Sequence, residues 1–519
     1  MCLTFISCGK MMTTDNSSDS SSCDEGSNRS GLNYEAKKSK KNQKNQPNAS
    51  SGFWLCTLLP LALSVSYFKF QKRTSATDST EAKCHSFTSI NADQMLAIAA
   101  VGMCIESLCF FMYLFVETGI LLKLLISFAP GLLTTFLYSW VMYKSLGFAF
   151  FWGFVVTFCY QNAYIHVMRG LPKCFTFGEA SILVQGCTLF VMNCLLQLPQ
   201  LYMGHVDLEG DELAQITAIM MVALLCVLIT CGLLAAFKTL RVGYGFYPLM
   251  AVLLVAVTMM PITSPLPIIF IFQFILSDLC RICIILFYLL LVAATIAAIS
   301  WQLKRSTQPK ASTSMRKVFH VLIVLVYVPG LIYQCSLLYL SSGVALAIFT
   351  VLELIRVLEI PPLGGVLKNS FKSFSDEKDS GLLALTPFCL LIGISMPLWL
   401  SPCACSNVQN TAAGSNLLSL MAGILSIGVG DTAASIIGSK YGHLKWKNSS
   451  RTLEGTSAYV VAVCLAVYAL YVGGFTPMSN VKWFITAAAI FVSSLVEAHT
   501  NQIDNLVLPL IFYIIVSLA

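Results

Sequence analysis

Long apolar stretches, separated by short polar connections, follow one another along most of the chain. A helix needs roughly 20 apolar residues to cross a bilayer, and in hydrocarbon a helix satisfies its own backbone hydrogen bonds. The pattern therefore predicts an all-α polytopic integral membrane protein with about 15 transmembrane helices. The longest stretch has room for two helices. The apolar stretches are near residues 53–69, 94–115, 119–140, 147–168, 178–200, 213–237, 244–261, 265–302, 318–341, 343–360, 382–402, 414–438, 456–474, 482–498 and 502–518.

The composition agrees with this class. Hydrophobic residues make up 56% of the 519 residues and charged residues only 11%, whereas a soluble domain carries about 25% charged residues. The net charge of +7 does not indicate a nucleic-acid-binding protein. The 20 cysteines lie mostly in apolar stretches, which predicts small buried side chains and not a disulfide framework. Neither Cys280/Cys283 nor Cys403/Cys405 has a second pair at zinc spacing, so no zinc site is expected.

The first 52 residues differ from the rest. They contain TTDNSSDSSSCDEGSNRS and then the lysine-rich KKSKKNQKNQ. A segment of such low hydrophobicity cannot bury a core, so residues 1–52 are predicted to form a disordered polar tail. The lysines precede the first apolar stretch, and the positive-inside rule therefore predicts that the tail is cytosolic.

Three basic loops in the C-terminal half indicate which side of the membrane carries the chemistry. They are LKRSTQPKASTSMRK, LKNSFKSFSDEKDSG and SKYGHLKWKNSSR. Two apolar stretches separate each loop from the next, so all three are expected on one face. Their excess of lysine and arginine predicts that this face is the cytosolic one.

The segment GVGDTAASIIGSKYG precedes the third loop and has two interpretations. Gly430, Ala434 and Gly438 recur every four residues, a pattern that lets membrane helices pack closely. Packing does not account for Asp431, because a carboxylate inside a membrane helix is costly and usually has a function. The stretch that follows offers lysines, an arginine, hydroxyls and glycine, which are the groups that bind phosphates. The residues alone thus predict a site for a polyanion and a divalent metal at the cytosolic face.

These motifs also resemble a known family. GDTAASIIGSKYG, KWKNSSRTLEGT and VEAHTNQIDNLVLPL resemble the C-terminal signature of the dolichol kinases, within a wider group of CTP-dependent lipid kinases. The resemblance implies transfer of the γ-phosphate of CTP to dolichol, giving dolichyl phosphate and CDP, in the endoplasmic reticulum membrane with the site facing the cytosol. The product would supply the lipid carrier for protein N-glycosylation and related glycan pathways. It also implies that residues 53–302 form an N-terminal multi-span region and residues 303–519 the kinase core.

The resemblance implies roles for individual residues. Asp431 corresponds to the family's Gly-Asp acid, and RKVFH supplies Arg316, Lys317 and His320 to the anion site. ELIR, FSDEKDSG and EAHTNQIDN also follow the family pattern, and their acids include Glu353, Asp376, Asp379, Glu497 and Asp504. The CTP-binding stretch would comprise Lys440, Tyr441, Gly442, His443, Leu444, Lys445, Trp446, Lys447, Asn448, Ser449, Ser450, Arg451, Thr452, Leu453, Glu454 and Gly455.

The catalytic roles stay open at this point. Asp431 is expected either to bind Mg²⁺ or to accept the proton of the dolichol hydroxyl. Asp376, Asp379 and Asp504 are the other candidates for accepting this proton, or for serving as further metal ligands. The cations of the CTP-binding stretch are expected to hold the phosphates.

Three other functions compete with this one. A kinase for phytol or diacylglycerol would use the same core, but the many spans before Arg316 favour dolichol. A CDP-lipid-forming cytidylyltransferase would use similar acids and bases and would release pyrophosphate instead of CDP. A transporter predicts charges near the bilayer midplane and two related halves, whereas here the charges gather at one interface.

Overall fold

The structure is a computed structural model that describes residues 50–76, 90–115, 119–143, 145–202, 211–263, 265–305, 313–374, 381–401, 404–405, 417–447 and 449–518. Almost all of the predicted tail lies outside these ranges. Asp376, Asp379 and Asn448 also lie outside them, and the side chain of Arg316 is not described.

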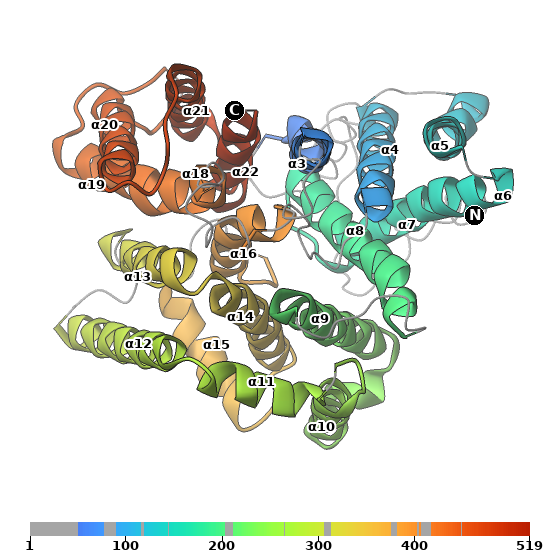
Figure 1. The fold of residues 1–519 in the computed structure, drawn as a ribbon, viewed down its shortest axis with the longest axis horizontal. Coiled ribbons are helices and arrows are strands. Elements are labelled where there is room, and N and C mark those ends of the chain that lie inside the picture. Colours follow the sequence, from blue (N-terminus) through green and yellow to red (C-terminus); the bar gives the residue numbers. More distant parts are fainter. Residues whose placement is uncertain are drawn as a thin grey trace, which may run out of the picture. The chain divides into compact units, whose positions relative to one another are not determined.

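All regular elements in the described residues are helices, labelled in Figure 1. Up to residue 305 they are η1 (Phe53–Thr57), α3 (Leu58–Ala76), α4 (Ile90–Phe115), α5 (Ile120–Met142), α6 (Leu146–Phe150), η3 (Phe151–Val155), α7 (Val156–Gly170), α8 (Phe177–Tyr202), α9 (Glu212–Ala236), η4 (Lys238–Arg241), α10 (Gly243–Met259), α11 (Pro267–Leu276) and α12 (Leu279–Arg305). The long stretch 265–302 thus contains two helices, α11 and α12, as expected.

The C-terminal part continues in the same way. Its helices are α13 (Thr313–Tyr333), α14 (Cys335–Val357), α15 (Leu363–Phe374), α16 (Leu385–Leu400), α18 (Leu417–Leu420), η7 (Ile424–Asp431), α19 (Thr432–Tyr441), α20 (Leu453–Val472), α21 (Asn480–His499) and α22 (Asp504–Ser517). Two of the elements, η3 and η7, are π-helices, in which the backbone takes a wider turn.

Ten of the described helices are long and apolar enough to cross a membrane, and five shorter apolar helices have 10–17 residues. The prediction of an all-α polytopic membrane protein is therefore confirmed. The count of about 15 spans stays a prediction, and so does the division of the chain near residue 302. One apolar cluster of buried residues crosses that position, since it extends from Leu55 on η1 to Val516 on α22.

The π-helix η7 is central to the C-terminal part. Helices α13, α20, α21 and α22 all pack against it, although they come from widely separated stretches of sequence. The neighbouring helix α22 also packs against α3 and α16. A hydroxyl chain supports that contact: Tyr513 is hydrogen-bonded to Ser66, and Ser66 donates to the carbonyl of Leu400. The first and the last α-helices of the described residues, α3 and α22, are therefore joined.

Polar contacts gather at two opposite ends of these helices. We call one the Arg451 end: it contains the starts of α8, α20 and α22 and the end of α21. The other, the Cys335 end, contains the starts of α9, α12 and α14, where Arg281 pairs with Glu212 at 2.8 Å. Helix α13 connects the two ends, because Lys317 lies near its start and Tyr333 at its last turn.

A disulfide joins Cys335 to Cys405 at the Cys335 end, with 5.3 Å between the two Cα atoms. Cys335 begins α14, and Cys405 follows α16. The expectation that the cysteines would act only as small apolar side chains is thus wrong for this pair. The two positions are 70 residues apart and are brought together only by the packing of α14 and α16.

Candidate functional site

Asp431 is the last residue of η7 and is buried, with 2% of its side chain exposed. At the end of this π-helix the Thr432 hydroxyl donates to the carbonyl of Ile427, five residues earlier. Such turns are common at functional positions because they re-aim a side chain within a helix. Here the turn directs the carboxylate of Asp431 toward α13.

Two side chains of α13 meet that carboxylate. The ammonium of Lys317 forms an ion pair with Asp431 Oδ2, and His320 Nε2 lies 3.5 Å from the same oxygen. Lys317 and His320 are three residues apart, so they lie on one face of the helix. The basic-plus-histidine motif RKVFH and the acid of the Gly-Asp motif are therefore brought together, as an anion site combining them requires.

The small residues beside Asp431 serve packing. A Cβ atom at Gly430 would lie 2.4 Å from the ring of Tyr459 on α20. A Cβ atom at Gly438 would lie 2.9 Å from the hydroxyl of Thr452. The packing interpretation of GVGDTAASIIGSKYG thus applies to the glycines: Gly430 lets η7, and Gly438 lets α19, approach α20 closely. Asp431 faces a different helix, α13.

Arg451 links two further acids at the same end of the bundle. Its Nε lies 3.3 Å from Glu497 Oε1, and its Nη2 lies 3.3 Å from Asp504 Oδ2. Glu497 is 2% exposed and is within electrostatic range of Asp431 and Lys317 as well. The contacts of Arg451 and those of Asp431 therefore belong to one cluster of charges, which we call the acid–base cluster: Lys317, His320, Asp431, Arg451, Glu497 and Asp504.

The predicted CTP-binding stretch forms a folded loop between α19 and α20. Lys445 and Thr452 form an antiparallel bridge, and the amide of Trp446 donates to the carbonyl of Arg451 at 3.0 Å. Glu454 accepts hydrogen bonds from the amides of His443 and Leu444, both at 3.0 Å. The loop thus holds its own shape before any ligand is bound.

The loop is also attached to the helices around it. The indole of Trp446 donates to the hydroxyl of Thr456, and its ring packs edge-on against His499 at the end of α21. The Ser449 hydroxyl donates to the carbonyl of Ala498. Trp446 donates its amide to the carbonyl of Arg451, and the Ser449 hydroxyl accepts the amide of Arg451. The anchored Trp446 and Ser449 therefore hold the backbone of Arg451 in place.

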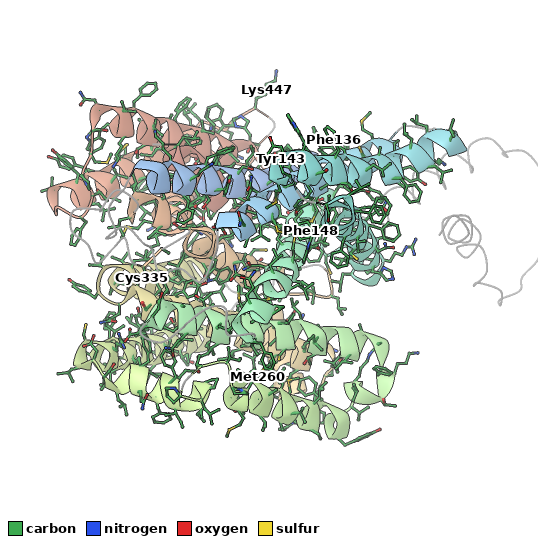
Figure 2. All side chains as sticks on the ribbon, turned by 45° about the vertical axis from the view of Figure 1, so that its right-hand side comes forward. Phe136, Tyr143, Phe148, Met260, Cys335 and Lys447 are labelled. Carbon is green, nitrogen blue, oxygen red and sulfur yellow. A yellow bond between two sulfur atoms is a disulfide. The ribbon has the colours of Figure 1, made fainter. Side chains whose placement is uncertain are left out.

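The lysines of the loop point away from the helices. Lys440, Lys445 and Lys447 are exposed, and Figure 2 shows Lys447 projecting outward from the bundle. Lys440 lies nine residues after Asp431 along the helix, which corresponds to about 14 Å. The end of α19 and the loop therefore carry exposed cations, and Lys440 is at a distance from Asp431 that an extended nucleotide could span.

Not every predicted site residue belongs to this arrangement. Glu353 and Arg356 form an ion pair at 2.6 Å, and Glu353 also accepts the amide of Ala384 at 2.7 Å. These contacts tie the end of α14 to the start of α16. We interpret these contacts as a structural link between the two helices.

The sequence had given Glu497 no catalytic role beyond its place in a motif. An acid inside an apolar helix is a signal for a functional position, and that signal applies to Glu497 as well as to Asp431. A second contact, between Glu179 on α8 and the 500–504 segment, carries no comparable signal in the sequence. It comes from the packing of segments more than 300 residues apart.

Two buried carboxylates near each other suit a divalent cation. Mg²⁺ binds through one or two carboxylates together with phosphate oxygens and water. Asp431 and Glu497 supply that number, and the described part of the chain holds no cluster of three or more metal-ligating side chains. The donor set therefore fits a Mg²⁺ ion that also binds phosphate oxygens and water.

The fold and this site define a polytopic helical membrane protein with a cluster of acids and bases at one end of its bundle. A family model described as dolichol kinase matches residues 152–389. Dolichol kinases of Bos taurus and Homo sapiens are each 34% identical to this chain over 374 residues, 70% of this chain and 68% of the relative. The dolichol kinase EVAN of Arabidopsis thaliana is 35% identical over 257 residues, 49% of this chain and 43% of the relative. No solved structure matches the chain. The chain belongs to the dolichol kinase family.

Proposed function

We propose that this protein is a CTP-dependent dolichol kinase of the endoplasmic reticulum membrane. It transfers the γ-phosphoryl group of CTP to the hydroxyl of dolichol, which gives dolichyl phosphate and CDP. The observation that carries the proposal is the acid–base cluster, in which the buried Asp431 meets Lys317 and His320 in a chain of this family. Such a cluster offers both the cations and the acids that phosphoryl transfer needs.

Phosphoryl transfer depends mainly on positioning and on charge stabilisation. Lys440, Lys445, Lys447 and Arg451 hold the phosphates of CTP at the mouth of the bundle. Lys317 contacts Asp431 in the structure, and it turns to the transferring phosphoryl group once the nucleotide is bound. His320 and Arg316 complete the cationic side of the site.

Asp431 and Glu497 would hold Mg²⁺, and the metal would supply neutralisation of the phosphate charge. The proton of the dolichol hydroxyl goes to a carboxylate. If Asp431 binds the metal, we expect Asp504 to accept the proton, because its contact with Arg451 makes it a member of the same cluster. Asp376 and Asp379 are the other acceptors that the sequence offers.

The proposed orientation places the Arg451 end in the cytosol, where CTP is available. The basic loops support it, because lysine and arginine concentrate on the cytosolic side. The disulfide at the Cys335 end supports it independently, because disulfides persist in oxidising compartments such as the lumen of the endoplasmic reticulum.

The test is incubation of the purified protein with γ-labelled CTP, Mg²⁺ and dolichol, with labelled ATP in a parallel reaction. We expect label in dolichyl phosphate from CTP and much less from ATP. Release of pyrophosphate with formation of a CDP-lipid would contradict the proposal. So would transfer to diacylglycerol or phytol in preference to dolichol.

A further inference from the structure

Glu179, in the first turn of α8, is a buried acid outside the acid–base cluster, with 1% of its surface exposed. Its Oε2 accepts the amide of Thr176 at 2.9 Å, and the Thr176 hydroxyl accepts the amide of Glu179 at 3.3 Å. This is a capping box, which satisfies amides that a helix start leaves unpaired. One oxygen of the carboxylate is enough for that purpose.

The other oxygen reaches a distant segment. Glu179 Oε1 accepts the amide of Ile503 at 2.8 Å, 324 residues further along the chain. The Thr176 hydroxyl donates to Gln502 Oε1 at 2.6 Å, and Gln502 Nε2 donates to the carbonyl of Ser50 at 2.9 Å. The capping box therefore fixes the connection between α21 and α22 to the N-terminal half of the protein.

That connection carries a member of the acid–base cluster. Ile503 is the residue that precedes α22, and Asp504 is the first residue of the helix. Asp504 lies 3.3 Å from Arg451, and Arg451 also contacts Glu497. Glu179 therefore binds the amide of the residue that directly precedes Asp504.

We infer that Glu179 is a positioning residue for phosphoryl transfer, acting through Ile503 to hold Asp504 against Arg451. The inference rests on the proposed function, since it concerns the geometry of that site. A buried carboxylate is costly unless it is fully hydrogen-bonded, and charge-assisted bonds to amides are strong and directional. A misplacement of about 1 Å in a catalytic group can cost a hundredfold in rate.

The first test is the variant Glu179→Gln, which keeps the size of the side chain. In the structure the amides of Thr176 and Ile503 bond different oxygens of the carboxylate. In the glutamine one of those oxygens is replaced by an NH2 group, which is a donor, so one of the two N–H groups would face a donor instead of an acceptor. We expect the kcat of dolichol phosphorylation to fall by about 10- to 100-fold, as for other residues that orient a catalytic group. The matched control is Gln185→Met on the same helix. Gln185 is buried and bonds Cys56 and Ser107, away from the 500–504 segment, so its loss should leave the activity of the folded protein unchanged.

A double variant separates positioning from simple stabilisation. If Glu179 acts through Asp504, then Glu179→Gln combined with Asp504→Asn should be no less active than Asp504→Asn alone. Losses that multiply would overturn the inference, because independent effects on the folded protein would add in free energy. Equal loss in Glu179→Gln and in the control would overturn it as well.

Hydrogen exchange of the full chain in detergent gives a readout that does not depend on catalysis. Glu179→Gln should raise the exchange of amides in 500–504 and leave the middle of α21 unchanged. Unchanged exchange in 500–504 would overturn the inference even if activity fell. If the wild-type protein phosphorylates no dolichol, the proposed function fails, and the exchange result alone decides whether Glu179 holds this segment.

Discussion

Lys317, at the start of α13, forms an ion pair with Asp431, 114 residues further along the chain. Both side chains are largely withdrawn from solvent, with 13% and 2% exposed. A buried ion pair seldom adds stability over apolar residues of the same size, because removing both charges from water is costly. Its presence in a helical membrane bundle is therefore better explained by function than by packing.

Removing one partner of this pair should be strongly destabilising. Lys317→Met would leave the carboxylate of Asp431 buried without its ammonium, and we expect a loss of about 3–5 kcal/mol in the free energy of unfolding. The control is Lys368→Met, because Lys368 pairs with Glu359 at the surface, with 43% and 56% exposed. Such a pair contributes about 0–1 kcal/mol. Unfolding of the two variants in detergent can be followed by tryptophan fluorescence. Similar losses of unfolding free energy in Lys317→Met and Lys368→Met would argue against the burial of the Lys317–Asp431 pair.

Arg451 should not be replaceable by lysine. Its guanidinium contacts Glu497 and Asp504 at once, and the compact ammonium of a lysine cannot reproduce that fork. We expect Arg451→Lys to raise the KM for CTP by about tenfold, equivalent to about 1.4 kcal/mol. Lys447→Ala, which removes an exposed cation, should have a smaller effect that disappears at high salt. Initial-rate kinetics over a range of CTP concentrations measures both, and an unchanged KM in Arg451→Lys would remove Arg451 from the nucleotide site.

The Cys335–Cys405 bond should lie across the membrane from the acid–base cluster. Cys335 follows Lys317 by 18 residues, about 27 Å along a helix, which is close to the thickness of the hydrocarbon core. In sealed microsomes, a membrane-impermeant reductant should leave the bond intact, and the same reductant should break it after detergent is added. Mass spectrometry of alkylated peptides gives the result. Reduction before detergent would place the Cys335 end in the cytosol and contradict the proposed orientation.

The packing of η7 against α20 predicts a contrast between two glycines. A Cβ atom at Gly430 would lie 2.4 Å from the ring of Tyr459, whereas one at Gly232 on α9 meets nothing within 4 Å. Gly430→Ala should therefore lower the midpoint of thermal unfolding. Gly232→Ala should leave it unchanged or raise it slightly, because alanine favours a helix by about 1 kcal/mol over glycine. Equal unfolding midpoints for the two variants would show that Tyr459 on α20 can move to accommodate a side chain at position 430.

The sequence could predict the helical class because hydrophobic periodicity and length are local properties. It also singled out Asp431, because a carboxylate in an apolar helix stands out without any structure. The resemblance then named Lys317, His320, Arg451 and Asp504 as further site residues. The structure brings these four into one cluster with Asp431. Their roles in binding CTP and in catalysis stay predictions.

Contacts between distant segments could not be predicted in this way. The bond between Cys335 and Cys405 joins residues 70 positions apart, and neither local sequence identifies the other as its partner. The contact of Glu179 with Ile503 depends on how α8 meets the start of α22. The wide turn of η7, which directs Asp431 toward α13, likewise follows from packing and not from a local pattern.

The most direct test of the central claim compares Asp431→Asn with the wild-type protein in transfer of label from γ-labelled CTP to dolichol. The variant keeps the size of the side chain and removes only its charge. The control is Asp278→Asn, since Asp278 lies at the Cys335 end, where it accepts a hydrogen bond from Gln334 at 2.6 Å. We expect Asp431→Asn to lose at least about a hundredfold in kcat while it remains folded, and Asp278→Asn to stay active. Wild-type activity in folded Asp431→Asn would contradict the account.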